Sequence, residues 1–243
     1  MFLHDVNFNK FNIAHGDTLI NPQHWDDQPF DAIVSNPPYG LQWESNSNPL
    51  LINDERFAPA GVLAPKSDAD YAFVMHMLHW LSSDGVCAFV ESPGILFRGG
   101  AEQKIRKYLV KNNYIDTVIM MPGNLFFGAT IATCIVVMRK NKTDNNVLII
   151  DAKSLCDKSG KRNVLGPKDI ETIISLVRER KTTEISVLVP FSDIEGTNFD
   201  LSYTKYVSVK KEEKEYRDSK IILKELKQIN GDIDLILANL EKE

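Results

Sequence analysis

The 243-residue chain is poor in cysteine, and it has no long hydrophobic run. Its three cysteines, Cys87, Cys134 and Cys156, lie far apart in no metal-like spacing, which argues against a disulfide framework and a zinc site. No apolar run reaches the ~20 residues that a transmembrane helix requires. The N-terminal segment MFLHDVNFNK lacks the basic region and apolar core of a signal peptide. We therefore expect a cytoplasmic protein with no membrane partner.

The chain also lacks an excess of positive charge. Its formal net charge is −5, whereas a protein that holds nucleic acid unaided usually carries a basic excess. Any contact with DNA must therefore be local, or it must be shared with a partner. The composition is otherwise that of an ordinary globular protein, because 43% of the residues are hydrophobic and 25% are charged.

Apolar strands alternate with amphipathic helices along residues 1–151, which predicts an α/β domain. Strands are expected at 11–19, 30–35, 85–91, 115–120, 132–140 and 146–151. Helices are expected at 69–82, capped by Ser67-Asp68, and at 101–113. The strand at 30–35 is almost continuously apolar, so we expect burial on both of its faces. Sheets of this class bind ligands just past the carboxyl ends of their strands.

The character of the sequence changes after residue 151. Residues 152–209 predict a mixed α/β extension, with a helix at 168–180 and short extended pieces at 191–209. Residues 210–243 predict an amphipathic helix with a coiled-coil seam, interrupted at Asn230-Gly231 and formed by Ile222, Leu226, Ile229, Ile233, Ile236 and Leu240. This helix either folds back on its own domain or docks on a partner, because the pattern does not identify what covers it.

A rigid turn follows the expected strand at 30–35, and its sequence is Asn36-Pro37-Pro38-Tyr39. Each proline restricts its own φ and the residue before it, so the side-chain oxygen of Asn36 and the carbonyl of Pro37 are held in place. Two acceptors aimed at the N–H bonds of an aromatic amine favour the tetrahedral nitrogen that can attack a methyl group. Tyr39 offers a flat face on which an extruded base can stack. The turn is thus either a clamp for a planar nitrogen or a plain loop.

The string resembles the catalytic motif of amino-methyltransferases that use S-adenosylmethionine, especially DNA adenine-N6 methyltransferases. Three further blocks resemble the methyltransferase (modification) subunit of type I restriction-modification systems and keep its order: SDADYAFVMHMLHWL (67–81), GILFRGGAEQKIRKYL (94–109) and MPGNLFFGATIATCIVVMRK (121–140). The resemblance implies methyl transfer to an adenine flipped out of double-stranded DNA, without a metal. It also implies a hetero-oligomer with a specificity subunit and, in some assemblies, a restriction subunit.

The same resemblance assigns roles to individual residues. The catalytic clamp corresponds to Asn36, Pro37, Pro38 and Tyr39. Asp17 matches the acidic position that contacts the adenine part of the cofactor, and Asn36 is grouped with it as cofactor-binding. Phe126 or Phe127 matches the aromatic residue that holds the flipped base opposite Tyr39.

Several of these residues also have a purely structural interpretation. Asp17 suits a turn after Gly16, and one of the two phenylalanines suits core packing. Arg98, followed by two glycines at the start of a helix, suits either a phosphate contact with the DNA or a tight turn.

One expected element is missing from the sequence. A methyltransferase of this kind needs a glycine-rich turn after its first strand, and the 13 glycines include no Gly-x-Gly pair. The chain therefore resembles the back part of a larger subunit, with an incomplete Rossmann-like fold and a C-terminal helical extension. We expect it to bind S-adenosylmethionine weakly or not at all alone, and to be inactive alone. The alternatives are an RNA or protein-glutamine methyltransferase with the same clamp, and a non-catalytic assembly remnant of the same fold.

Overall fold

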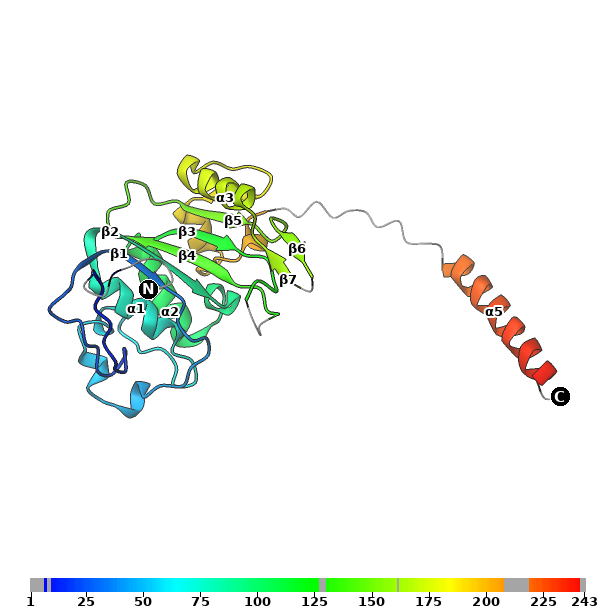
Figure 1. The fold of residues 1–243 in the computed structure, drawn as a ribbon, viewed down its shortest axis with the longest axis horizontal. Coiled ribbons are helices and arrows are strands. Elements are labelled where there is room, and N and C mark those ends of the chain that lie inside the picture. The colour runs from blue at the N-terminus through cyan, green and yellow to red at the C-terminus, as the bar shows by residue number, and fades with distance from the viewer. Residues whose placement is uncertain (1–6, 8–9, 127–129, 161, 208–218, 241–243) are drawn as a thin grey trace. The chain divides into compact units, whose positions relative to one another are not determined.

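Figure 1 shows the computed structural model of the protein, which describes residues 7, 10–126, 130–160, 162–207 and 219–240. The chain divides into two compact units, Met1–Val207 and Ser208–Glu243. Residues 152–207 thus belong to the same unit as the expected methyltransferase part. Within the described residues, no helix combines the length and apolarity needed to span a bilayer.

The first unit contains four helices and eight strands among its described residues. The helices are α1 (Asp70–Trp80), α2 (Gly100–Lys111), α3 (Pro167–Glu179) and α4 (Phe191–Gly196). The strands are β1 (Phe30–Ser35), β2 (Leu81–Glu91), β3 (Ile115–Met120), β4 (Cys134–Arg139), β5 (Val147–Asp151), β6 (Asp157–Ser159), β7 (Arg162–Val164) and β8 (Ser186–Val189). Most of the helices and strands expected from the sequence are confirmed.

Six strands form one mixed sheet in the order β1-β2-β4-β3-β5-β8. The pairs β1–β2 and β3–β5 are parallel, whereas β4 and β8 run antiparallel to their neighbours. A separate hairpin joins β6 to β7. Ser35, the last residue of β1, pairs with Phe89 of β2, so the turn after β1 lies beside the end of β2.

Helices cover the two faces of the sheet, as Figure 1 shows. Buried residues of α1, α2 and α4 pack in one cluster with one face, and Ile173 of α3 packs with the other. The side chains of β5 alternate between these clusters: Ile149 joins the first, and Leu148 and Ile150 join the second. This period of two is the reason that a strand buried on both faces is apolar throughout.

Two expectations about the N-terminal region are wrong. Residues 11–19 form bends and turns, not a strand. The carbonyls of Thr18 and Leu19 accept hydrogen bonds from the side chain of Arg56 and not from a neighbouring strand. The strand β1 is formed, but it is not buried on both faces, since Val34 is 85% exposed. The physical reason is that β1 is an edge strand, paired on one side only within the described part of the chain.

The expectation of extended pieces at 191–209 is also wrong. The described part of this segment, 191–207, forms α4 and a short 3-10 turn at Tyr203–Lys205, because Ile194, Phe199 and Leu201 enter the core beside α2; residues 208 and 209 lie outside the described residues.

The second unit contains the helix α5 (Ser219–Leu240). It runs without a break through Asn230 and Gly231, where the sequence suggested an interruption. Within this unit, the seam residues Ile222, Leu226, Ile229 and Ile233 are 40–54% exposed, whereas the side chains of Ile236 and Leu240 lie outside those that the structure describes.

Candidate active site

The turn Asn36–Tyr39 lies at the carboxyl end of β1, where the sequence predicted it. Pro37 is buried, whereas Asn36, Pro38 and Tyr39 are exposed. The Tyr39 hydroxyl donates a hydrogen bond of 2.7 Å to Asn36 Oδ1. Among the described residues, no group donates to the Pro37 carbonyl. Of the two expected acceptors, the Pro37 carbonyl thus belongs to a buried residue and has no donor among the described residues, and Asn36 Oδ1 accepts from Tyr39.

The charge state of Tyr39 favours this internal hydrogen bond. Burial, followed by the charges of Glu91, Cys134 and Asp70, raises the pKa of Tyr39 to about 12. The phenol is therefore protonated at neutral pH and can donate to Asn36.

The far end of the turn is fixed to helix α1. The Gly40 amide donates to Asp70 Oδ1 at 2.9 Å, and the Ala69 amide donates to the Leu41 carbonyl at 2.9 Å. Gly40 has a φ of +61°, a left-handed conformation that favours glycine. Asp68 Oδ1 also accepts from the Asp70 amide at 3.1 Å, which confirms that Asp68 helps to begin α1.

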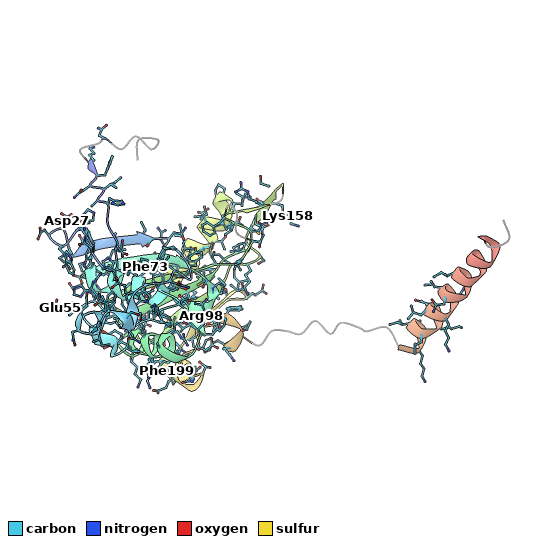
Figure 2. The ribbon with its side chains drawn as sticks, turned by 90° about the horizontal axis from the view of Figure 1, so that it is seen from below. Asp27, Glu55, Phe73, Arg98, Lys158 and Phe199 are labelled. Carbon is cyan, nitrogen blue, oxygen red and sulfur yellow. The ribbon has the colours of Figure 1, made fainter. Side chains whose placement is uncertain are left out.

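A cavity of about 610 Å³ lies beside the turn Asn36–Tyr39 and includes Pro38 in its lining. It brings Asp17 and Pro38, two residues singled out from the sequence, together with Phe73 of α1 and Trp43. Figure 2 labels Phe73 within the first unit. Trp43 also packs inside the protein, because it is 8% exposed and its Nε1 donates to the Pro65 carbonyl at 2.9 Å. The volume is within the range of small-molecule sites, which is about 300–1,000 Å³.

Asp17 shapes the wall of this cavity through its own turn. Its Oδ1 accepts from the amides of Leu19 at 2.9 Å and Ile20 at 3.1 Å. No donor to Oδ2 is found in the described part of the chain, so this oxygen can accept from the amino group of a purine.

The side chain of Arg56 holds the turn that contains Asp17 through hydrogen bonds to its backbone. Its side chain is 2% exposed and donates to the carbonyls of Thr18 at 3.1 Å and Leu19 at 2.7 Å. It also pairs with Asp54 at 2.7 Å and contacts His76 Nδ1 at 3.2 Å. Burial, and then the charge of Arg56, lower the pKa of His76 to about 4, so the imidazole is neutral and can accept from the guanidinium.

A second cavity, of about 430 Å³, lies near the end of β2 and is lined mainly by apolar residues. Its lining includes Phe126, Val90, Thr133 and Asn163. Thr133 Oγ1 is buried and finds no hydrogen-bond partner among the residues that the structure describes. Phe126 and Tyr39 do not line a common cavity among the residues described. Phe127 lies outside the described residues.

Arg98 is surrounded by carboxylates. It forms ion pairs with Asp68, with Asp70 at 3.3 Å and with Glu102 at 3.3 Å. Gly100 has a φ of +67°, so it allows the turn into α2.

Glu91, at the end of β2, is fully buried beside this carboxylate cluster. Its Oε2 accepts from the Ser92 amide at 3.1 Å, and no described residue donates a hydrogen bond to its Oε1. Burial, followed by the charge of Asp70, raises the pKa of Glu91 to about 9, so this carboxyl is neutral at pH 7.

A family model described as N-6 DNA Methylase matches residues 1–215. The chain belongs to the N-6 DNA methylase family. The MpnII methylase subunit of a type I restriction enzyme from Mycoplasma pneumoniae is 39% identical over 98% of this chain and 44% of its own length. The MjaVII methylase subunit from Methanocaldococcus jannaschii is 30% identical over 94% of this chain and 41% of its own length.

A solved structure agrees with these relatives. The crystal structure of the methyltransferase subunit of a type I restriction-modification system from Streptococcus thermophilus has a TM-score of 0.81 and 36% identity, over 86% of this chain and 45% of that chain. The similarity confirms the predicted α/β fold and the predicted family. The chain spans less than half the length of the curated relatives it matches.

In this N-6 DNA methylase, the structure groups some of the predicted residues and separates others. Asp17 and Pro38 share one cavity, and Phe126 lines another. The sequence interpretation missed Phe73 as a cavity residue, although Phe73 lies in the DYAF block that carried the resemblance. It also assigned no role to Arg56 or to Asp70, which begins the same block, because the bonds of Arg56 to Thr18 and Leu19 and the bond of Asp70 to Gly40 join segments that lie far apart in the chain.

Proposed function

We propose that this N-6 DNA methylase chain supplies the base-clamping part of a DNA adenine-N6 methyltransferase of the type I restriction-modification class, with S-adenosylmethionine as methyl donor. The proposal rests on one observation above all: the Asn-Pro-Pro-Tyr turn ends an edge strand beside a cavity that contains Asp17. The names of the relatives support the substrate class.

The chemistry follows from the two acceptors. Asn36 Oδ1 and the Pro37 carbonyl each accept a hydrogen bond from the exocyclic amine of an extruded adenine. This draws the nitrogen toward a tetrahedral geometry and makes its lone pair available. Tyr39 gives up its hydrogen bond to Asn36 and presents its ring to the base. Bound S-adenosylmethionine would supply a methyl group carried on a sulfonium sulfur. After transfer of the methyl group, the sulfur would leave as a neutral thioether.

The residues around the first cavity fit the nucleoside end of this cofactor. Asp17 Oδ2 can accept from the purine amine, and Phe73 offers an apolar ring face. These groups contact one end of the molecule only, and the sequence has no glycine-rich turn for the other end. We therefore propose that the isolated chain binds S-adenosylmethionine weakly or not at all, which titration calorimetry tests. Micromolar affinity of the isolated chain would contradict this.

We further propose that the chain acts in a hetero-oligomer with a specificity subunit, and with a restriction subunit in a cleaving assembly. The net charge of −5 supports a shared DNA contact. The exposed seam of α5 is the proposed docking element. Deletion of residues 210–243 should abolish capture of the specificity subunit in a pull-down, and unchanged capture would refute the assignment.

The central experiment is methylation by the reconstituted complex with labelled cofactor. DNA, RNA and protein substrates are offered in separate reactions, and we expect label only in DNA, on adenine N6. Asn36→Ala should lower kcat by about 10²–10³-fold, the size of effect found when one preorganised polar group of a transition-state site is removed. Asn145→Ala, at an exposed asparagine after β4, is the matched control and should be neutral. Equal activity of the two variants would refute the clamp.

A further inference from the structure

We propose that Asp70 is a positioning residue for the catalytic turn, and that Arg98 acts on the turn through Asp70 and not through a DNA phosphate. The inference rests on the proposed function and adds a support for its clamp. It is drawn from the contacts that join three separate segments: the turn at 36–41, the start of α1 and the residues before α2.

The turn itself has few other attachments. Tyr39 bonds within the turn, to Asn36. The first polar link from the turn to the helical layer is the bond between the Gly40 amide and Asp70 Oδ1, at 2.9 Å. The Leu41 carbonyl adds a second link, to the amide of Ala69. Both links end at the first residues of α1, so the position of the clamp follows the position of this helix.

Helix α1 is a rigid base for such a link. Asp70 is fully buried, and the residues that follow it, Tyr71, Ala72 and Val74, are 3% exposed or less. The Tyr71 hydroxyl donates to the Ile95 carbonyl at 2.7 Å, which joins α1 to the segment before α2. A carboxylate at the first turn of a helix is also favoured by the helix dipole.

Arg98 contacts the same carboxyl group, that of Asp70, through the oxygen that the turn does not use. It contacts Asp70 Oδ2 at 3.3 Å, so Asp70 uses one oxygen for the turn and the other for Arg98. Arg98 also pairs with Asp68 and Glu102. A guanidinium that already serves three carboxylates has little attraction left for a phosphate, whereas a buried carboxylate needs a compensating charge.

The charges around Asp70 make this link sensitive to pH. Burial, with a smaller contribution from Asp68, raises the pKa of Asp70 to about 6 against the opposing effects of the Gly40 hydrogen bond and the Arg98 charge. The titratable groups that face Asp70 from the surrounding elements are Asp68, Glu91, Arg98, Glu102, Tyr39 and Cys134. Below pH 6 Asp70 takes up a proton and becomes a weaker acceptor for the Gly40 amide.

The first test is hydrogen exchange at the Gly40 amide in the full chain, followed by NMR, and it does not depend on catalysis. Asp70→Ala removes the acceptor, so exchange of this amide should accelerate. Asp70→Asn keeps Oδ1 in place, so it should accelerate the exchange of this amide less than Asp70→Ala does. If Asp70→Ala does not fold, Asp70→Asn still provides the test. Unchanged exchange in both variants would overturn the link between Asp70 and the turn.

The second test is the kinetics of the reconstituted complex. Misplacement of a reacting group by about 1 Å costs on the order of 10²-fold, so Asp70→Ala should lower kcat by about this factor. KM for DNA should be unchanged. Arg98→Gln should lower kcat in the same way, and its effect should not add to that of Asp70→Asn. The kcat of the wild-type complex should fall as the pH drops below about 6, and this fall should be absent from the pH profile of Asp70→Asn.

Salt dependence separates the two roles of Arg98. Loss of a phosphate contact reduces the slope of log K against log salt concentration by about 1, and we expect no change in Arg98→Gln. A reduced slope with unchanged kcat would overturn the inference and assign Arg98 to DNA. If the wild-type complex methylates no substrate, the proposed function fails, whereas the hydrogen-exchange result still decides whether Asp70 holds the turn.

Discussion

Replacement of Arg56 should strongly destabilise the folded state, because this residue joins the cavity turn to the rest of the unit. Its guanidinium serves two backbone carbonyls, those of Thr18 and Leu19, and pairs with Asp54. It lies 4.6 Å from the ring centroid of Phe57. Arg56→Ala removes all of these contacts at once.

The cost follows from the groups that are left without a partner. Each buried acceptor that loses its donor costs about 1–3 kcal/mol, and the contact with an aromatic ring adds about 0.5–1 kcal/mol. Water can reach Asp54, whose side chain is 22% exposed, so its loss counts for less. Together these effects amount to about 3–5 kcal/mol, the size expected when one partner of a buried ion pair is removed.

The assay is urea denaturation of the full chain, with the free energy of unfolding extrapolated to water. The free energy of unfolding should fall about half as much in Arg56→Lys as in Arg56→Ala, because a single ammonium cannot serve both carbonyls and Asp54. Arg178→Ala is the matched control, since Arg178 is exposed on α3, and it should stay within about 0.5 kcal/mol of the wild type. A loss below about 1 kcal/mol for Arg56→Ala would refute the idea that this side chain holds the turn.

Three further predictions concern the site itself. Glu91 has its folded-state pKa raised to about 9, so this carboxyl should contribute a loss of stability of about 1.4 kcal/mol per pH unit as pH rises from about 4.5 to 9; in urea unfolding, the free energy of the wild type minus that of Glu91→Gln should fall with this slope, and a difference that stays constant with pH would contradict it. Tyr39→Phe frees Asn36 Oδ1 and keeps the ring, so the reconstituted complex should retain its kcat; a loss of more than about tenfold would show that the hydroxyl is needed. Phe73→Leu keeps apolar volume but removes the ring face, so KM for S-adenosylmethionine should rise by about two- to tenfold at constant kcat, and an unchanged KM would place the nucleoside elsewhere.

Local patterns in the sequence were sufficient for most of the secondary structure. The β-branched residues of β3 and β5 and the helical spacing of α2 lead to elements that differ from expectation by one or two residues at their ends. The predicted strand at 11–19 is wrong because the apolar pattern suits a strand, whereas the carbonyls of Thr18 and Leu19 accept from Arg56, 38 and 37 residues away. A contact over that distance has no local signature.

The prediction that β1 is buried on both faces is wrong for a different reason. Its composition suits a strand covered on both faces, but burial depends on what lies beside the strand, and no described element covers Val34. The candidate site likewise has one part that the local sequence predicts and another that only the fold reveals. The Asn-Pro-Pro-Tyr string revealed the turn, since the prolines act locally. The bond between Gly40 and Asp70 spans 30 residues and required the fold.

The edge of β1 has a consequence for how the protein behaves at high concentration. An unpaired strand edge is a template for another strand, and the outward side chain of Val34 adds an apolar surface to it. Two copies can therefore join edge to edge, so light scattering should increase with concentration. Val34→Lys places a charge on that surface, away from the core, and should keep the solution clear.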